Sequence, residues 1–201
     1  MTEEPKIKTK IIAKNIVLVG NPLTFQVASF GYNKEKLFYG RYFLNFGDGD
    51  YKEIQANNMT ENGGKFTHIY FYTGDYIVSL EYYMGYYGDI PDASDQMTIK
   101  VVDSDILISA TGNEKDFFVE LTNNTDHDAD ISNWILSSSL QSFTFPKNTI
   151  INSKKKLTIS PSLTHFSLSD KETLKLMTSQ WKTVFDYGES ASYVAKKENN
   201  P

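Results

Sequence analysis

The spacing of apolar residues constrains the fold of this 201-residue chain more than any other feature. Between Tyr76 and Tyr82 every second residue is apolar, whereas Ser79 and Glu81 lie between them. A period of two is typical of a half-buried β-strand, because a surface helix repeats every 3.6 residues. Similar runs, separated by clusters of Gly, Asn, Asp and Ser, occur at 23–29, 38–46, 65–71, 96–102, 117–121, 156–160 and 173–177. Many short strands divided by turn signals predict an all-β fold of the sandwich type.

The composition changes near the middle of the chain, which indicates two domains. Residues 1–105 hold 11 of the 13 Tyr and 10 of the 12 Gly, whereas residues 106–201 hold 14 of the 18 Ser and both Trp. We therefore expect one domain at 1–104 and a second at 105–190, each long enough to bury its own core. The charged, Asn-rich end at 191–201 is expected to be a disordered tail.

Charge and cysteine content exclude several classes of function. The chain has 20 basic and 25 acidic side chains and no cysteine, which excludes a disulfide scaffold, a thiolate metal site and a cysteine nucleophile. An acidic balance without a basic block argues against nucleic acid as the main partner. The longest uncharged run, between Lys14 and Lys34, is broken by Gly, Asn and Pro, so no membrane span is expected.

The most informative motif of the first half is a strand that ends in Phe46-Gly47-Asp48-Gly49. The two glycines supply positive φ angles and Asp48 can accept hydrogen bonds from nearby backbone amides, so we expect a tight hairpin. A nucleotide-binding loop would need a helix after the glycines, and the residues that follow alternate like a strand instead.

A second segment places His68, Tyr70, Gly74 and Tyr76 in the spacing His-x-Tyr-x-x-x-Gly-x-Tyr. Together with the glycine corner, this segment resembles the PKD (polycystic kidney disease) domain over about residues 10–103. The resemblance implies an immunoglobulin-like sandwich of the kind found mostly in extracellular spacers and adhesion modules.

Within this resemblance, Leu44 and Asn45 stand where the family usually has Trp and Asp. We expect His68 to be structural and to bond a turn near the glycine corner, because nothing in the sequence places a nucleophile beside it.

The second half carries Val119-Glu120-Leu121-Thr122-Asn123, followed by Ile131-Ser132-Asn133-Trp134-Ile135-Leu136. These segments resemble the lamin tail domain over about residues 106–187, which implies a second immunoglobulin-like sandwich. Trp134 is then the expected plug of the core, and Glu120 and Asn123 are expected to hold backbone groups at strand ends.

Asn133 replaces the usual Gly of that family, and Asn tolerates positive φ better than most residues. Bacterial members of the family accompany secreted or surface proteins, including hydrolases and nucleases, and animal members belong to the nuclear lamina. The family carries no catalytic residue at the position of Glu120, so we expect no enzyme activity from this module.

Tyr83, Tyr86 and Tyr87 are binding candidates, because outward tyrosine rings can stack on sugars or fill a protein interface. The alternative is that these rings pack on their own domain.

Asp126, Asp128 and Asp130 are metal candidates, because alternate carboxylates on a loop can hold calcium. The alternative is a solvated loop, since the glycine and distal glutamate of an EF-hand are missing.

The sequence therefore predicts two tandem immunoglobulin-like β-sandwich domains without catalytic residues or an organic cofactor. We expect a spacer, adhesion or binding module of an extracellular or cell-surface protein, most in keeping with a prokaryotic source, whose partner is a surface protein or a glycan. One alternative is an accessory region of a larger secreted hydrolase or nuclease, and another is an intracellular scaffold. The acidic start Met1–Pro5 lacks the pattern of a secretion signal, so export would require a signal that has been removed.

Overall fold

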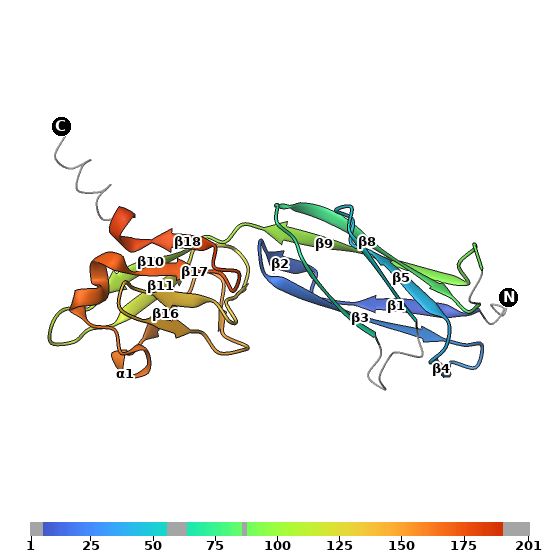
Figure 1. Cartoon of the computed structure of the whole chain (residues 1–201), viewed down its shortest axis with the longest axis horizontal. Helices are drawn as coiled ribbons and strands as arrows, with labels where there is room; N and C mark the ends of the chain where they lie inside the picture. The colour runs from blue at the N-terminus through green and yellow to red at the C-terminus, as the bar shows by residue number, and fades with distance from the viewer. Residues whose placement is uncertain (1–5, 56–63, 86–87, 191–201) are drawn as a thin grey trace. The chain divides into compact units, whose positions relative to one another are not determined.

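The computed structural model describes residues 6–55, 64–85 and 88–190, and this part of the chain is built of β-strands with short helical turns (Figure 1). The all-β fold class is confirmed. The chain divides into two compact units, Met1–Val102 and Asp103–Pro201, whereas the sequence placed the division between residues 104 and 105. Tyr86, Tyr87 and the tail at 191–201 lie outside the described residues.

The first unit contains two β-sheets, which Figure 1 shows as two layers. Sheet A is antiparallel and joins β1 (Lys8–Ile12), β3 (Pro22–Phe30), β4 (Lys36–Leu37) and β7 (Gly64–Ile69), with β3 at its centre. Sheet B has the order β2 (Ile16–Leu18), β9 (Ala93–Val102), β8 (Gly74–Tyr83), β5 (Arg41–Asn45) and β6 (Tyr51–Gln55). β2 runs parallel to β9, and the other pairs of sheet B are antiparallel.

The inward faces of the two sheets form a single core, as the period of two in the sequence requires. Its fully buried members include Phe25 and Val27 from β3, Leu44 from β5 and Leu80 from β8. Apolar burial drives this packing, because each side chain removed from water contributes about 1.5–3 kcal/mol.

Two charged side chains link the sheets at opposite edges of the first unit. Asp95 on β9 accepts a hydrogen bond from the backbone N–H of Ile11 on β1, at 2.8 Å. On the other side, Lys52 on β6 donates to the carbonyl of Thr67 on β7, at 2.9 Å. Each bond satisfies a backbone group that an edge strand would otherwise leave without a protein partner.

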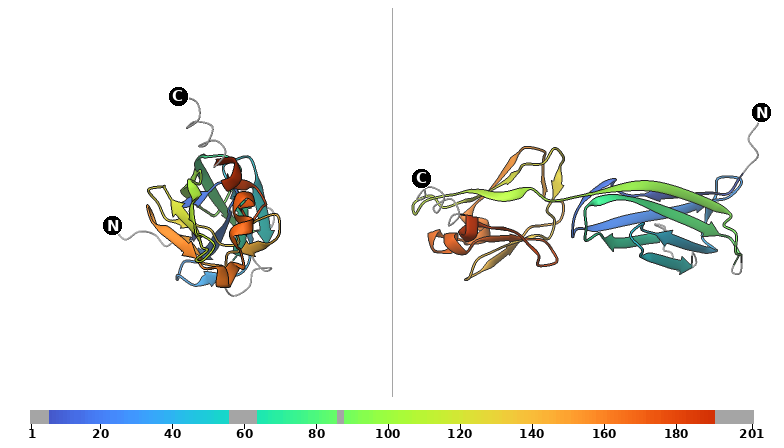
Figure 2. Two further views of the ribbon diagram at one scale, coloured as in Figure 1. Left: turned by 90° about the vertical axis from the view of Figure 1, so that its left-hand side faces the viewer. Right: turned by 90° about the horizontal axis from the view of Figure 1, so that it is seen from above.

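The second unit is built from three small antiparallel sheets (Figure 2). They are β10 (Ile106–Thr111) with β11 (Val119–Asn123) and β16 (Lys156–Ile159), β12 (Ala129–Asp130) with β15 (Ile150–Ile151), and β14 (Ser142–Thr144) with β13 (Ile135–Ser137), β17 (Lys175–Met177) and β18 (Thr183–Asp186). One turn of α-helix, α1 (Pro161–Thr164), and one 3-10 helix, η2 (Leu168–Thr173), follow β16. Among the described residues, no helix has the length and apolar character needed to cross a membrane.

The structure shortens several strands that the sequence predicted, and the strand expected at 38–46 loses the most residues. That strand begins only at Arg41, because Gly40 adopts a φ of 88° and breaks the extended run. A side chain could not replace this glycine, since a Cβ atom there would lie 2.3 Å from the carbonyl oxygen of Tyr83. The sequence also missed the helical turns α1 and η2, which are too short to show a period.

Candidate functional site

The glycine corner forms the tight hairpin between β5 and β6 that the sequence predicted. Gly47 and Gly49 adopt φ angles of 85° and 100°. The Asn45 side chain accepts from the Gly47 N–H at 2.8 Å, and the Phe46 N–H donates to the Asp50 carbonyl at 3.0 Å. The corner therefore holds its own backbone and presents Asp48 and Asp50 to the neighbouring strand β7.

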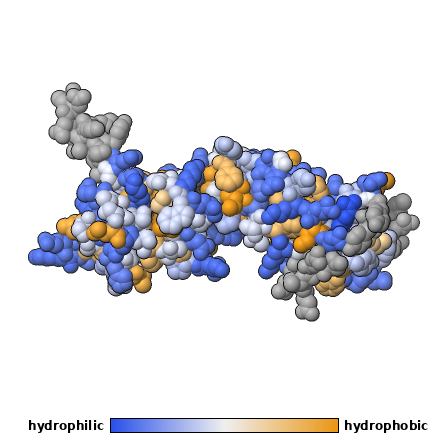
Figure 3. All heavy atoms as spheres, in the orientation of Figure 1, coloured by the Kyte–Doolittle hydropathy of each residue, from blue (hydrophilic) through white to orange (hydrophobic). Residues whose placement is uncertain are grey.

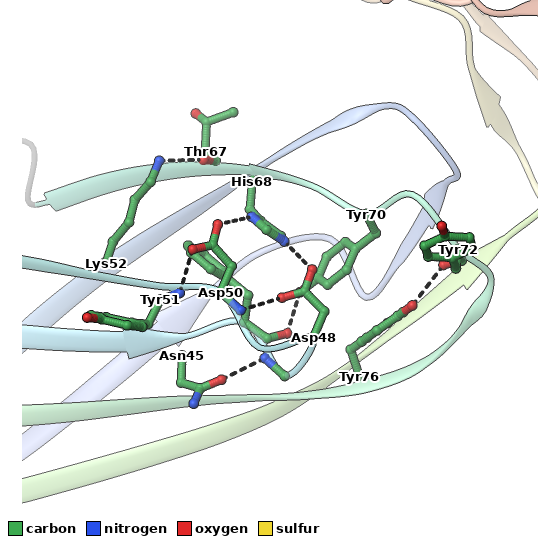
Figure 4. A network of polar contacts seen from close by, with 12 residues as sticks. Asn45, Asp48, Asp50, Tyr51, Lys52, Thr67, His68, Tyr70, Tyr72 and Tyr76 are labelled. Atoms are coloured by element: carbon green, nitrogen blue, oxygen red, sulfur yellow. Dashed lines mark hydrogen bonds and ion pairs between the residues drawn. The ribbon is translucent and has the colours of Figure 1, made fainter.

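His68 on β7 lies against this corner (Figure 4). Its Nε2 is 2.6 Å from Asp48 Oδ2, and its Nδ1 is 3.5 Å from Asp50 Oδ2. The imidazole stacks on the Phe46 ring at a centroid distance of 4.1 Å and meets the Tyr70 ring edge-on at 4.7 Å. Both ring nitrogens thus face carboxylates of the corner, which is the structural placement that the sequence predicted for His68.

The remaining signature residues support the same corner. Tyr70 donates from its hydroxyl to the Phe46 carbonyl at 2.9 Å, and burial, followed by the nearby charge of Asp48, raises the pKa of Tyr70. The Tyr76 ring lies 4.5 Å from the Tyr70 ring. Gly74 begins β8 with a φ of 156° and lies under the Tyr76 ring. These side chains form a packed aromatic cluster rather than an open site.

Tyr83 does not offer the outward ring that was considered from the sequence, because it is only 9% exposed. The Arg41 guanidinium covers its ring at 4.1 Å, and its hydroxyl donates to Glu81 at 2.6 Å. That hydrogen bond, together with burial, raises the pKa of Tyr83. Arg41 is held in turn by Glu53 at 3.4 Å and by the Gly88 carbonyl at 2.7 Å.

Glu120 binds side chains, and the prediction that it holds backbone groups is wrong. Its Oε1 accepts from Lys156 Nζ at 2.9 Å and from Ser109 Oγ at 2.8 Å. The bonds from Lys156 and then Ser109 hold the pKa of Glu120 below its usual value. Ser109, Glu120 and Lys156 lie on β10, β11 and β16, so these bonds cross the whole three-stranded sheet. The sequence could not show this, because cross-strand neighbours depend on register.

Asn123 holds backbone groups as predicted, and it has no exposed surface. Its Nδ2 lies 2.9 Å from the carbonyls of His127 and Ile151 and 3.2 Å from that of Asn152. Its Oδ1 accepts from the N–H and the hydroxyl of Thr125, at 3.0 and 2.7 Å. One amide therefore ties the end of β11 to the loops that flank β12 and β15.

Trp134 is completely buried, as expected for the plug of the core. The residue before it, Asn133, has a φ of 60°, which is the conformation that a glycine would adopt without strain. The Asn133 N–H donates to the Phe145 carbonyl at 3.0 Å, and the Phe145 N–H donates to the Trp134 carbonyl at 2.9 Å. This pair of bonds fixes the direction in which the indole enters the core.

The three aspartates considered as calcium ligands each have a different partner. Asp126 is 92% exposed at its side chain and lies 3.0 Å from Lys154 Nζ. Asp128 accepts from the Ser153 N–H at 2.9 Å, and Asp130 accepts from the Ser132 N–H at 3.1 Å. Among the described residues, no group of three or more His, Cys, Asp or Glu side chains is arranged to hold a metal ion.

Asp170, in η2, is a buried carboxylate that the sequence analysis missed, with 1% of its surface exposed. It accepts from Ser138 Oγ at 2.5 Å, from Gln141 Nε2 at 3.2 Å and from the Ser167 N–H at 2.9 Å. Burial alone would raise the pKa of Asp170, but these hydrogen bonds outweigh burial and lower it. The spacing Ser167-x-x-Asp170 is a capping-box pattern, and it could have indicated this residue.

Several large aromatic side chains among the described residues are exposed to solvent, and the three most exposed, Phe71, Tyr72 and Trp181, were not predicted as binding candidates from the sequence. Phe71 and Tyr72 follow β7, and Trp181 lies in the turn between β17 and β18, where it is 65% exposed. Trp181 also has a φ of 60°, which is costly for a bulky residue. Figure 3 shows exposed apolar surface as separate patches on the face in view. No sequence signal marks Trp181, because it stands alone between polar residues.

Comparison with protein-family models connects the second half of the chain to a known family. The family model "Lamin Tail Domain" matches residues 95–199, beginning inside β9, and confirms the resemblance of the second half. No curated protein matches the sequence.

Among solved structures, a PKD domain of the human VPS10 domain-containing receptor SorCS2 is similar, with a TM-score of 0.35 and 19% identity over 53% of this chain and 76% of that one. Native alpha-2-macroglobulin of E. coli has a TM-score of 0.38 and 12% identity over 78% of this chain. A mutant alpha-2-macroglobulin of Salmonella has a TM-score of 0.36 and 12% identity over 79% of this chain. The match spans 14% of either macroglobulin. Nothing about activity or partners follows from likenesses this low.

Replacing His68 by Ala is expected to destabilise the protein by about 1–3 kcal/mol, because the change removes the stacked ring and leaves Asp48 without its imidazole partner. Calorimetry of the full chain should show a melting temperature several degrees lower. Tyr72→Ala, at an exposed ring nearby, is the matched control and should leave the melting temperature unchanged. Equal melting temperatures for both variants would show that His68 has no structural role.

Asp170 is expected to make stability fall in acid. Its pKa in the folded chain lies below the ordinary 3.8, so the ionised form stabilises the fold above that pH and the stabilisation disappears as the pH falls through the folded pKa. Urea unfolding measured from about pH 5 to about pH 2 should therefore show a shallower loss of stability in Asp170→Asn than in the unmodified protein. Asp126→Asn, at an exposed carboxylate, should keep the original slope.

Proposed function

This chain belongs to the lamin tail domain family, and from that premise we propose that it is a non-catalytic module of an extracellular or cell-surface protein. Its role is to space neighbouring domains or to attach the protein to a surface protein or a glycan.

The proposal rests on one observation: the polar side chains that could act as catalytic groups are hydrogen-bonded to other groups of the protein. His68 is held by Asp48, Glu120 by Ser109 and Lys156, and Asn123 by backbone carbonyls. A general base must keep its reactive atom within reach of a substrate proton. These groups instead form hydrogen bonds within the protein, which supports a structural role for them.

Exposed aromatic rings support a binding role. Phe71, Tyr72 and Trp181 present apolar area to solvent from turns rather than from the core. Trp and Tyr are the residue types most enriched where a few contacts carry most of an interface energy. A tryptophan kept at a positive φ is locally strained, and such strain is concentrated at functional positions.

The extracellular part of the proposal is supported by the signature of the first half. The glycine corner and the spacing of His68, Tyr70, Gly74 and Tyr76 resemble the PKD domain, whose members are mostly extracellular. Both units achieve their packing without cysteine, so the fold itself is compatible with an oxidising or a reducing compartment.

Protease treatment of intact cells tests the proposal. The native protein, detected by an antibody, should be cut by trypsin added outside the cells, while a cytosolic marker survives until the cells are lysed. Protection equal to that of the marker would contradict an extracellular location and favour an intracellular scaffold. Turnover of a polysaccharide or nucleic acid by the purified native protein would contradict the non-catalytic part and favour an enzyme accessory region.

A further inference from the structure

The outward face of sheet A carries lysines on both sides of its central strand. On β1, Lys8 and Lys10 point outward, because Thr9 between them is buried. On the opposite side of β3, Lys36 of β4 and Lys65 of β7 occupy outward positions. We call the surface formed by Lys8, Lys10, Lys36 and Lys65 the lysine face.

Strand register places these lysines in two lanes. Phe30 of β3 lies between Lys8 and Lys36, since it pairs with both. Lys10 pairs with Ala28, and Lys65 pairs with Gln26. With strands about 4.8 Å apart, the two lanes stand about 10 Å from each other across β3. Along β1, alternate residues are about 7 Å apart.

No carboxylate opposes these charges at the outward positions of the described strands of sheet A. The other outward residues are Ile12 of β1, Pro22, Thr24, Gln26, Ala28 and Phe30 of β3, and Thr67 and Ile69 of β7. The acidic residue next to Lys36 in the chain, Glu35, turns toward its own loop and accepts from the Asn33 N–H at 2.9 Å.

The outward face of sheet B carries charges of both signs. Glu53, Asp75 and Glu81 occupy outward positions there, together with Arg41, which forms an ion pair with Glu53, and Lys100, which is the register partner of Asp75. The outward positions of the described strands of sheet A, in contrast, carry basic residues and no acidic ones. Such a surface attracts and orients an anionic partner.

We propose that the lysine face binds a linear anionic polysaccharide, which lies along β3 between the two lysine lanes. Lysine ammonium groups bind carboxylate or sulfate groups as mobile point charges, and this suits a flexible chain whose anionic groups repeat along one line. The inference rests on the proposed function, because it takes the first unit to be the binding part of a surface module.

Two other polyanions fit this surface less well. A single-stranded nucleic acid stacks its bases on exposed aromatic rings. Two rings lie beside the lysines: Phe30 is half-buried in the central strand, and Phe38, which follows β4, lies under Lys36 Nζ at 5.4 Å. These two rings offer no continuous row on which successive bases could stack. An anionic lipid surface carries its charge over two dimensions. The uncharged strand β3 between the two lysine lanes would then have no role, whereas it leaves room for a linear chain.

The test measures binding of the full chain to polygalacturonate, dextran sulfate, neutral dextran, single-stranded DNA and phosphatidylserine vesicles. The unmodified protein should bind at least one of the two anionic polysaccharides and should not bind neutral dextran. Its affinity for the anionic polysaccharide should fall as the salt concentration is raised. Binding to polygalacturonate alone assigns a carboxylate ligand, and binding to dextran sulfate alone assigns a sulfate ligand.

Two quadruple variants with the same net charge distinguish the effect of the lysine face from the effect of the overall charge of the protein. The variant Lys8→Gln, Lys10→Gln, Lys36→Gln, Lys65→Gln should bind at least about tenfold more weakly. The control Lys115→Gln, Lys147→Gln, Lys155→Gln, Lys182→Gln, at exposed positions of the second unit, should bind like the unmodified protein. If the first variant fails to fold, Lys8→Gln with Lys10→Gln alone should still weaken binding severalfold, because both side chains are exposed and outside the core.

Three results would overturn the inference: equal weakening in both quadruple variants, tighter binding to DNA or vesicles than to either polysaccharide, or no binding to any polyanion. None of these results bears on the protease experiment, which tests the location of the protein. Failure of the lysine face is therefore distinguishable from failure of the proposed function.

Discussion

A buried amide, that of Asn123, is the interaction on which the second unit depends. The side chain has no exposed surface, and its polar atoms contact the backbone of Thr125, His127, Ile151 and Asn152. A buried polar group without a partner costs about 1–3 kcal/mol, so the surrounding loops are fixed in the one arrangement that satisfies this amide. The short sheets of the second unit thus meet around a polar centre, beside the apolar core that contains Trp134.

The need to pair buried polar groups also explains why residues that resemble catalytic groups in the sequence have structural roles in the folded protein. His68 connects β7 to the glycine corner through its hydrogen bond with Asp48. Asp170 connects η2 to the turn at Ser138. Each has its hydrogen-bonding atoms directed at protein groups. What the molecule offers to a partner is instead its outer surface, where lysines gather on one sheet and Trp181 stands in a turn.

Local patterns in the sequence predicted the features that depend on local chain geometry. The period of two predicted the strands, the glycines predicted the corner at Gly47, and the resemblance to the lamin tail domain predicted burial of Trp134. Features that depend on strand register were not predictable, because they join residues far apart in the chain. The bond between Glu120 and Lys156 spans 36 positions, and that between Asp95 and Ile11 spans 84. The two lanes of the lysine face became visible only once β1, β4 and β7 were placed around β3.

Equilibrium unfolding of Asn123→Asp tests the central claim most directly, because the change keeps the shape and the acceptor oxygen but removes the N–H groups directed at the backbone carbonyls. We expect a loss of at least about 3 kcal/mol, since the variant also buries a charge. Asn148→Asp, at an exposed position of the second unit, should change the stability by less than about 0.5 kcal/mol. Equal stabilities of the two variants would contradict the view that a buried amide organises the second unit.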